Sequence, residues 1–239
     1  SAPAEIQPLI AAVNQSLDSI EAGAAAQRDF SIHAAHELRT PLADLKLRLE
    51  SISSLPDRNA AMRDIDAMAR LIEQLLQIAR LDGSNTFSLQ SLHLGDTVAQ
   101  ILEEAAPPLM ATGWTIEAEG LDLPVQIIGD PTLITLIIRN LLDNVRKHTP
   151  QGSTVTISIS ADGTLLFADT GPGLPKWFPA SNFSRFVRGN EDTRSGSGLG
   201  LSICETAMRR MKGSFRRDPT FSGSAFRLTF SLDPTKAVI

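Results

Sequence analysis

Hydrophobic residues recur at heptad spacing through the first third of the chain. Steps that alternate between three and four residues bury one stripe of a helix against partner helices, so the pattern predicts two long coiled-coil segments. The first seam is Ile6, Ile10, Val13, Leu17, Ile20 and Ala24, and the second is Ala35, Leu38, Leu42, Leu45, Leu49 and Ile52. The two seams are out of phase, and such a stutter locally unwinds a coiled coil. It predicts either a point where a signal enters the helix or an ordinary linker helix.

A third seam predicts a second helix after a break at residues 53–57, where Pro56 and Asp57 stop the pattern and restart it. Its members are Ala61, Ile65, Met68, Ile72, Leu75 and Ala79. Additional leucines and isoleucines make the apolar stripe wider than one antiparallel helical hairpin can bury. Two copies that form a four-helix bundle would bury it, so we expect a homodimer.

The pattern becomes mixed after residues 82–85, which read Asp-Gly-Ser-Asn and predict a stop and a flexible hinge. Asp162-Gly163 is a strong hairpin signal, and Pro131 is placed as proline can be in the first turn of a helix. The pattern predicts strands at 87–92, 114–119, 125–128, 154–160, 165–168, 214–217 and 225–232, and helices at 95–112, 131–148 and 198–212. The first of these helices is expected to be interrupted at Pro107-Pro108. The fold class is therefore α + α/β: the helical bundle, then an α/β sandwich with a mixed sheet and helices on one face.

The composition of the chain argues against nucleic acid and membrane as binding partners. The chain has 239 residues and a net charge of −5 with acids and bases interspersed, so it offers no basic stripe for nucleic acid. Its single cysteine excludes an internal disulfide and fits a reducing cytoplasm. No apolar run approaches the roughly 18 residues that a membrane span needs, so we expect no membrane contact by this chain.

The most unusual residue of the first region is His36, which falls one position past a seam residue and therefore points away from the buried stripe. Glu37 is its neighbour, and Thr40, four residues on, shares its face. An outward imidazole beside a carboxylate is a nucleophile with a base, although a single surface histidine is more often inert. A zinc-protease site would need a second histidine at position 40, where this chain has Thr40. His33 could in principle pair with His36 to bind a metal, but no cysteine or third histidine lies nearby in the sequence.

A second group of polar residues lies on the predicted helix 131–148. Asn140, Asn144 and Lys147 are spaced by four and three, so they share one face. An amide oxygen can complete the oxygen shell of Mg²⁺, whose other ligands are phosphates and waters, and a lysine suits a phosphate as a point charge. Taken alone, the spacing is a weak signal, because Asn and Lys on a helix usually just face solvent.

Two glycine-rich stretches complete the candidate chemistry. Asp169 ends a predicted strand and precedes Gly171 and Gly173; its carboxylate could accept the exocyclic amine of adenine, or the stretch could be a simple turn. Residues 196–201, GSGLGL, open a helix whose N–H groups can cradle a phosphate. They match neither the dinucleotide fingerprint nor the P-loop, which ends in GK[ST].

In this order, these motifs resemble those of bacterial sensor histidine kinases. HELRTPL at 36–42 resembles the H-box, NLLDNVRKHT at 140–149 the N-box, DTGPG at 169–173 the G1 box, FSRFVR at 183–188 the F-box and GSGLGL the G2 box. The resemblance implies that His36 is the phospho-acceptor, Glu37 its base, and Thr40 the residue that positions water for dephosphorylating a partner.

The resemblance also implies an ATP·Mg²⁺ pocket. In it Asn144 would be the Mg²⁺ ligand, Asn140 and Lys147 would bind phosphates, and Asp169 would bind adenine. The remaining implied pocket residues are His148, Gly171, Gly173, Arg188, Gly196, Gly198, Leu199 and Gly200. His148 stands where the family commonly has an aromatic Tyr or Phe, and Val145 where it usually has Ala.

On this resemblance we divide the chain into a membrane-proximal signalling helix at 1–29, similar to the end of a HAMP linker, and a dimerisation and histidine phosphotransfer domain at 30–82. A hinge at 83–88 and a catalytic ATP-binding domain at 89–239 follow. The implied function is autophosphorylation of His36 and transfer to an aspartate on a response-regulator receiver domain, with dephosphorylation of that partner. The fragment would be cytoplasmic, from a parent in the inner membrane. A catalytically silent scaffold and an ATP-driven conformational clamp are the alternatives.

Overall fold

The computed structural model describes residues 87–183 and 198–235, together with the helical positions 42, 43, 45, 62, 65, 66, 68, 69, 72–74, 76, 77 and 81. The chain divides into two compact units, residues 1–86 and residues 87–239. Each unit is described by itself below.

The first unit is helical at all of its described positions, as the heptad pattern predicts. Leu42, Ile65, Ile72 and Leu76 form one buried hydrophobic cluster. This cluster joins the first predicted helix to the second, which is what an antiparallel hairpin requires. Two other seam residues, Leu45 and Met68, remain 47% and 52% exposed, so part of each predicted seam is not covered within one chain.

The second unit contains a five-stranded sheet with the strand order β2-β4-β5-β7-β6. β2 and β4 are parallel and the other pairs are antiparallel, so the sheet is mixed, as predicted. Its strands are β2 (Thr115–Glu119), β4 (Thr154–Ser160), β5 (Thr164–Asp169), β6 (Ser214–Arg217) and β7 (Ala225–Thr229). A separate two-stranded sheet pairs β1 (Gln90–His93) with β3 (Gln126–Gly129).

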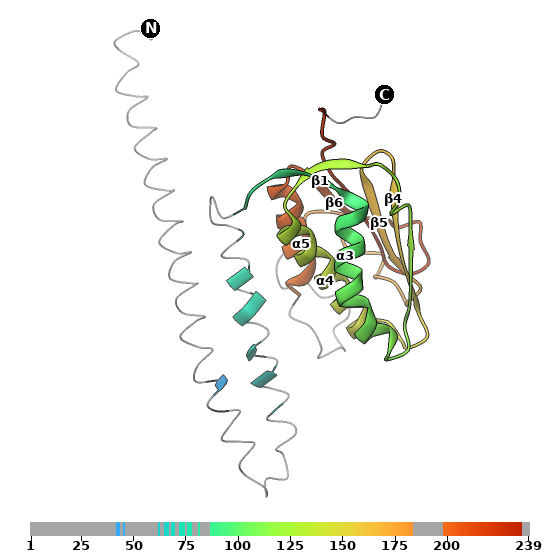
Figure 1. The fold of residues 1–239 in the computed structure, drawn as a ribbon. Coiled ribbons are helices and arrows are strands. Elements are labelled where there is room, and N and C mark those ends of the chain that lie inside the picture. The colour runs from blue at the N-terminus through green and yellow to red at the C-terminus, as the bar shows by residue number, and fades with distance from the viewer. Residues whose placement is uncertain are drawn as a thin grey trace, which may run out of the picture. The chain divides into compact units, whose positions relative to one another are not determined.

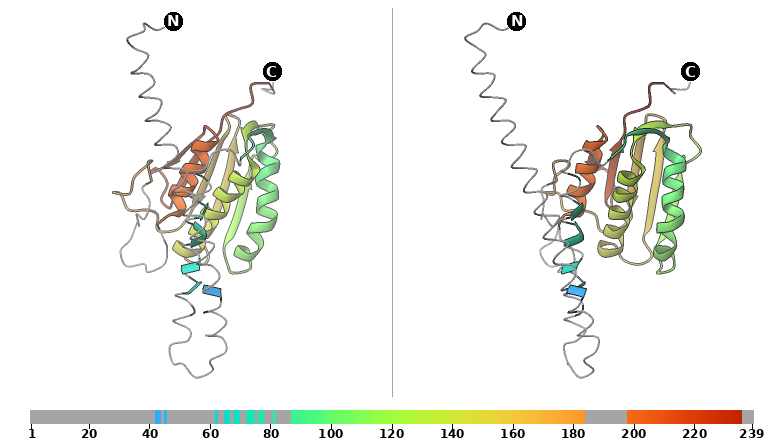
Figure 2. Two further views of the ribbon diagram at one scale, coloured as in Figure 1. Left: turned by 90° about the vertical axis from the view of Figure 1, so that its left-hand side faces the viewer. Right: turned by 60° about the vertical axis from the view of Figure 1, so that its left-hand side comes forward.

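Three helices lie side by side over one face of the five-stranded sheet, as Figures 1 and 2 show. They are α3 (Leu94–Met110), α4 (Pro131–His148) and α5 (Gly200–Arg210). The middle helix, α4, packs against both others, and its apolar side chains from Leu133 to Val145 are buried. Its opposite, polar stripe carries the predicted Asn140, Asn144 and Lys147.

Some predictions about this unit need correction. Helix α3 is not interrupted at Pro107-Pro108 but continues through both prolines to Met110. A proline removes the hydrogen bond to the carbonyl four residues earlier. Here both prolines, Glu103 and Glu104 are all exposed, so the released carbonyls lie on the side where water can replace the lost donors. Two strand boundaries also differ: the first strand begins at Gln90, not at residue 87, and the last strand ends at Thr229, not at residue 232.

None of the helices among the described residues is both long enough and apolar enough to cross a membrane.

Candidate functional site

Helix α4 positions the polar stripe because both of its ends are fixed by side chains. Asp130 caps the first turn, where its Oδ1 accepts hydrogen bonds from the backbone of Thr132 and Leu133 at 2.8 and 3.3 Å. At the other end the Thr149 hydroxyl donates to the carbonyl of Val145 and accepts from the buried indole N–H of Trp114 at 2.9 Å. The helix is therefore held at both termini, and the stripe between them has a defined orientation.

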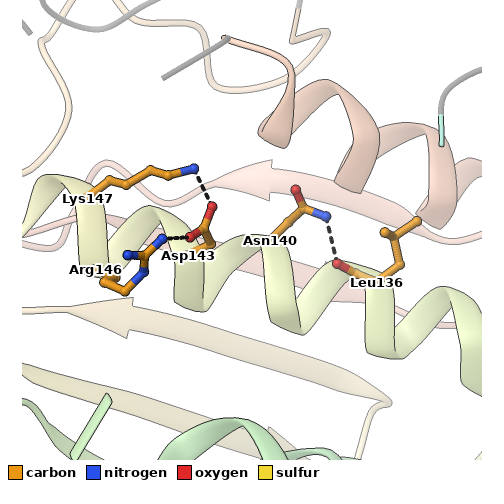
Figure 3. Close-up of polar contacts among 5 residues, drawn as sticks. All are labelled: Leu136, Asn140, Asp143, Arg146 and Lys147. Atoms are coloured by element: carbon orange, nitrogen blue, oxygen red, sulfur yellow. Dashed lines mark hydrogen bonds and ion pairs between the residues drawn. The ribbon is translucent and has the colours of Figure 1, made fainter. Parts of the chain in front are cut away.

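The two asparagines of the stripe meet the start of helix α5. A methyl group at Gly200 would lie 3.4 Å from Oδ1 of Asn144 and 3.5 Å from Oδ1 of Asn140. The Asn140 amide is oriented by its own helix, since its Nδ2 donates to the carbonyl of Leu136 at 2.8 Å (Figure 3). The structure thus places the start of α5, where a helix has backbone N–H groups without intrahelical partners, beside two amide side chains of α4.

Lys147, the cation of the stripe, is paired within its own helix. Its Nζ forms an ion pair with Oδ2 of Asp143, and Arg146 bonds the other oxygen at 2.6 Å (Figure 3). Partial burial raises the pKa of Asp143, but the hydrogen bonds and charges of Lys147 and Arg146 outweigh it, so the pKa lies below its ordinary value. Asp143 is therefore ionised at neutral pH and competes for the ammonium group that the resemblance assigns to phosphate.

Asp169 ends strand β5 and is almost fully buried, with 8% of its surface exposed. Its Oδ1 accepts the backbone N–H groups of Gly171 at 2.8 Å and Ser224 at 3.4 Å. Burial raises the pKa of this carboxyl, although hydrogen bonds from Gly171 and Ser224 oppose the shift. Because both backbone donors bond Oδ1, Oδ2 is the oxygen that can accept a donor from a ligand.

Glycines allow the backbone to close around Asp169. A Cβ at Gly171 would lie 2.5 Å from Cγ2 of Thr149 and 2.8 Å from Oδ1 of Asp169, and one at Gly223 would lie 1.8 Å from the Asp169 carbonyl oxygen. Gly173 has a φ of +75°, in the left-handed region that favours glycine. At Gly223 a side chain would meet backbone, so the turn before β7 packs directly on the backbone of Asp169, whereas at Gly171 the close atoms belong to the side chains of Thr149 and Asp169.

His148, the last residue of α4, lies among charged neighbours. Partial burial and the charge of Lys147 lower its pKa, whereas the carboxylates of Asp143 and Asp169 oppose the shift. The net direction keeps the imidazole neutral at pH 7, so its ring can offer an uncharged flat surface at the edge of the site.

Among the predicted pocket residues that the structure describes, two local groups can be recognised. A Cβ added at Gly200 would lie 3.4–3.5 Å from the side-chain oxygens of Asn144 and Asn140, and Asp169 accepts the backbone N–H of Gly171. Gly198 has a φ of +71° and Leu199 is fully buried beside it, so the loop before α5 has the backbone that its glycines allow. The predicted site residues that lie outside the described residues are His36, Glu37, Thr40, Arg188 and Gly196.

Some residues that support this pocket were not predicted from the sequence. Ser224 and Gly223 bond or pack against Asp169 from the far end of the domain, and nothing in a local motif points to them. Thr149 and Asp143 could have been predicted more easily, because both lie inside the NLLDNVRKHT motif and helical spacing places Asp143 one turn before Lys147. A search for i, i+4 pairs would have found that ion pair.

Comparisons with known proteins agree with this geometry. Residues 26–84 match the His Kinase A (phospho-acceptor) domain, and residues 129–234 match the histidine kinase-, DNA gyrase B- and HSP90-like ATPase. The chain is 35% identical to the sensor protein QseC of Escherichia coli O157:H7 over 217 residues, 85% of this chain and 47% of that protein. It is 32% identical to the sensor protein BasS of Salmonella typhimurium, over 90% of this chain and 62% of that protein.

A solved structure of the mycobacterial sensor histidine kinase MprB also resembles this chain. The likeness has a TM-score of 0.50 at 25% identity and covers 61% of this chain and 99% of the other. The chain spans about half the length of QseC and somewhat more of BasS.

Proposed function

Because the chain belongs to the sensor histidine kinases of two-component systems, carrying both the phospho-acceptor and the ATPase regions, we propose that it phosphorylates its own His36 from ATP. The observation that carries this proposal is the closeness of Gly200 to Asn140 and Asn144, whose side-chain oxygens would lie within 3.5 Å of a Cβ added at Gly200. Two motifs that are far apart in sequence thus lie close together, the start of helix α5 beside two amide side chains of helix α4. The N-terminus of a helix favours phosphate groups, and amide oxygens can complete the shell of the Mg²⁺ that accompanies them.

The proposed nucleotide contacts follow from the described side chains. Oδ2 of Asp169 would accept the exocyclic amine of adenine, because Oδ1 is already held by the backbone. Asn140 and Lys147 would contact phosphates, with His148 at the edge of the ring site. The residues after Asp169 and before α5 would shape the loops around the nucleotide: Gly171, Gly173, Gly196, Gly198, Leu199 and Gly200. Arg188 and Gly196 are included on the family resemblance alone.

The donor set fits magnesium only when a nucleotide accompanies it. Within residues 87–183 and 198–235, no group of three or more His, Cys, Asp or Glu side chains could hold a metal. Mg²⁺ is commonly bound through one or two protein oxygens together with phosphates and waters, and Oδ1 of Asn144 would be such an oxygen. When bound, the ion would neutralise charge on the phosphates.

The proposed transfer uses His36 and Glu37 from the phospho-acceptor region. A ring nitrogen of neutral His36 attacks the γ-phosphorus, the bond from phosphorus to the β–γ bridging oxygen breaks, and ADP leaves. Glu37 accepts the proton from the other ring nitrogen as positive charge develops on the imidazole. Positioning and electrostatics, rather than covalent chemistry by the protein, lower the barrier of such transfers.

The proposed partners are a second copy of the chain and a receiver domain. Leu45 and Met68, which remain about half exposed within one chain, support a dimer, because a partner hairpin would cover them. We also propose that phospho-His36 passes its phosphoryl group to an aspartate of a response regulator, and that Thr40 positions water to remove it again. The proposed location is the cytoplasmic side of the inner membrane.

Incubation with ATP labelled at the γ-phosphate tests the proposal. Wild-type protein should acquire an acid-labile, alkali-stable label, His36→Ala should bind ATP without acquiring it, and the matched variant His33→Ala should label normally. Free phosphate without protein label would instead indicate a clamp ATPase, and neither product a silent scaffold. Labelling of His36→Ala at another residue would refute the assignment of the acceptor.

A further inference from the structure

Residues 174–183 follow the glycine loop after Asp169 and contain neither helix nor strand. The backbone N–H and C=O groups of such a segment have no partners in a helix or a sheet, so they need other hydrogen-bond partners where the segment packs against the protein. In this segment, two charged side chains of opposite sign supply many of them: a guanidinium takes carbonyls and a carboxylate takes N–H groups.

Arg217, at the end of β6, bonds the first part of the segment. Its guanidinium donates to three carbonyls at 2.7–3.1 Å, and its backbone N–H donates to a fourth at 2.8 Å. The four acceptors are the carbonyls of Leu174, Pro175, Phe178 and Ala180. One arginine therefore determines the path of the chain directly after Gly173.

Glu205, in the middle of helix α5, bonds the last part. Its Oε1 accepts the N–H of Asn182 at 2.7 Å and its Oε2 accepts the N–H of Phe183 at 2.8 Å. Asn182 has a φ of 57°, a left-handed conformation that costs most residues free energy. Both carboxylate oxygens are thus used to stabilise one turn of backbone, which is unusual for a glutamate on a helix surface.

The turn that Glu205 holds places Phe183 in the core. The Phe183 ring is 5% exposed and lies 5.3 Å from the ring of Phe215 and 6.4 Å from that of Phe226, centroid to centroid. Aromatic pairs at these separations are favourable beyond the area that they bury. The ring anchors the segment, and the carboxylate sets the direction in which the backbone leaves it.

Both ends of the segment are thereby connected to the candidate nucleotide site. At one end Leu174 follows Gly173 of the loop that bonds Asp169. At the other end Glu205 lies on the same helix as Gly200, which is close to the side chains of Asn140 and Asn144. We propose that Glu205 is a positioning residue for nucleotide binding, one that holds Asn182 and Phe183 at a fixed place relative to the start of α5. This inference rests on the proposed ATP-dependent function.

The test compares Glu205→Ala and Glu205→Gln with a matched control, Glu104→Ala. Glu104 is also a helix glutamate of this unit, paired with Arg139 at 2.9 Å, but on the exposed surface of α3. For each variant we would measure the Kd for ADP, the KM for ATP and the rate of His36 labelling at saturating ATP.

We expect Glu205→Ala to raise the KM and the Kd about 5- to 30-fold, because without the carboxylate the turn at Asn182 and Phe183 is no longer held and binding must order it, while the rate at saturating ATP changes less than about twofold. Glu205→Gln should show about a third of the increase, because its amide has one acceptor oxygen where the carboxylate has two. Glu104→Ala should match wild type.

Several outcomes separate this inference from the proposed function. Failure of the wild type to label His36 would refute the function, and the ADP measurement would still decide on Glu205. A lower melting temperature with unchanged Kd and KM would show a merely structural role and overturn the inference. If Glu205→Ala does not fold, Glu205→Gln decides instead, and a wild-type Kd and KM for that variant would overturn the inference equally.

Discussion

The two sides of the candidate site are built in different ways. On the carboxylate side, which comprises Asp169, Gly171, Gly223 and Ser224, a buried acid is held by backbone N–H groups and lies beside glycines at which a Cβ would clash. On the amide side, which comprises Asn140, Asn144 and Lys147 with Asp143, the charged group is held by an ion pair between side chains on a helix surface.

This difference predicts that the carboxylate side recognises the base of the nucleotide and that the amide side rearranges when the phosphates bind. The backbone on the carboxylate side cannot rearrange without moving β5, so Oδ2 of Asp169 is in place before a ligand arrives, and preorganisation of this kind lowers the cost of binding. Lys147 must instead exchange Asp143 for a phosphate. We therefore expect selectivity for the base to depend on the carboxylate side, and the response to phosphate charge to depend on the amide side.

The largest effect is expected for Asp169→Asn, which tests whether the carboxylate side recognises the base. The amide keeps the shape but can face the adenine amine with an NH₂ group, so a hydrogen bond to a charged acceptor is lost; this is worth about 1.5–3 kcal/mol, or about 10- to 150-fold in the Kd for ADP. Titration calorimetry measures the change. Asp122→Asn, the same substitution at an exposed position, should bind as wild type does.

A second ligand sharpens this prediction. Guanine presents a carbonyl oxygen where adenine presents its amine, so Asp169→Asn should also reduce the preference for ADP over GDP. An unchanged ADP:GDP ratio, even with weaker binding of both, would mean that Asp169 supports the loop without contacting the base.

A smaller effect is expected for Gly171→Ala, which tests whether the backbone packing preorganises the carboxylate. The new methyl group would lie 2.5 Å from Thr149 and 2.8 Å from Oδ1 of Asp169, and overpacking of this kind costs about 1–3 kcal/mol of stability. If part of that strain displaces the carboxylate, the Kd for ADP rises about 5- to 30-fold.

Gly152→Ala is the matched control for Gly171→Ala. Gly152 has a φ of +88° with open space around it, so alanine there destabilises the fold through backbone conformation alone. Thermal unfolding should report a loss for both variants, whereas calorimetry should report weaker ADP binding only for Gly171→Ala. Equal effects of the two variants on ADP binding would indicate that general destabilisation, and not displacement of Asp169, is responsible.

The same contrast explains how far the sequence could predict this molecule. Local signals were sufficient for α4, where Pro131 and the apolar spacing predict the helix from its first residue to His148, and for the hairpin at Asp162-Gly163. The polar stripe on α4 follows from helical periodicity, so the amide side could be predicted in part. Assigning Asp169 to a strand end was also within reach of a local motif.

Contacts across long sequence separations could not be predicted in this way. The bond from Ser224 to Asp169 and the carboxylate of Glu205 on Asn182 depend on how β7 and α5 return to the site. The pairing of β1 with β3 has no turn signal, because helix α3 lies between them. The continuous helix at Pro107-Pro108 depends on which side of α3 faces solvent, which is a property of packing rather than of proline itself.

The smallest expected effect, from Asp143→Asn, tests whether the amide side adapts. The substitution removes the negative charge that holds Lys147 and leaves the shape of the side chain. The pair is partly buried, with 17% of the Lys147 and 36% of the Asp143 side chain exposed, so removing it frees Lys147 but also leaves its ammonium without a partner. A negative charge near the bound phosphates opposes their binding. We therefore expect the Kd for ATP to fall about two- to fivefold, with no change for adenosine, which lacks phosphates.

Asp96→Asn, at an exposed position in the first turn of α3, is the control for net charge and should leave both affinities unchanged. Weaker ATP binding by Asp143→Asn would reverse the interpretation: Asp143 would then orient Lys147 toward the phosphates rather than compete for it, and the amide side would be as preorganised as the carboxylate side.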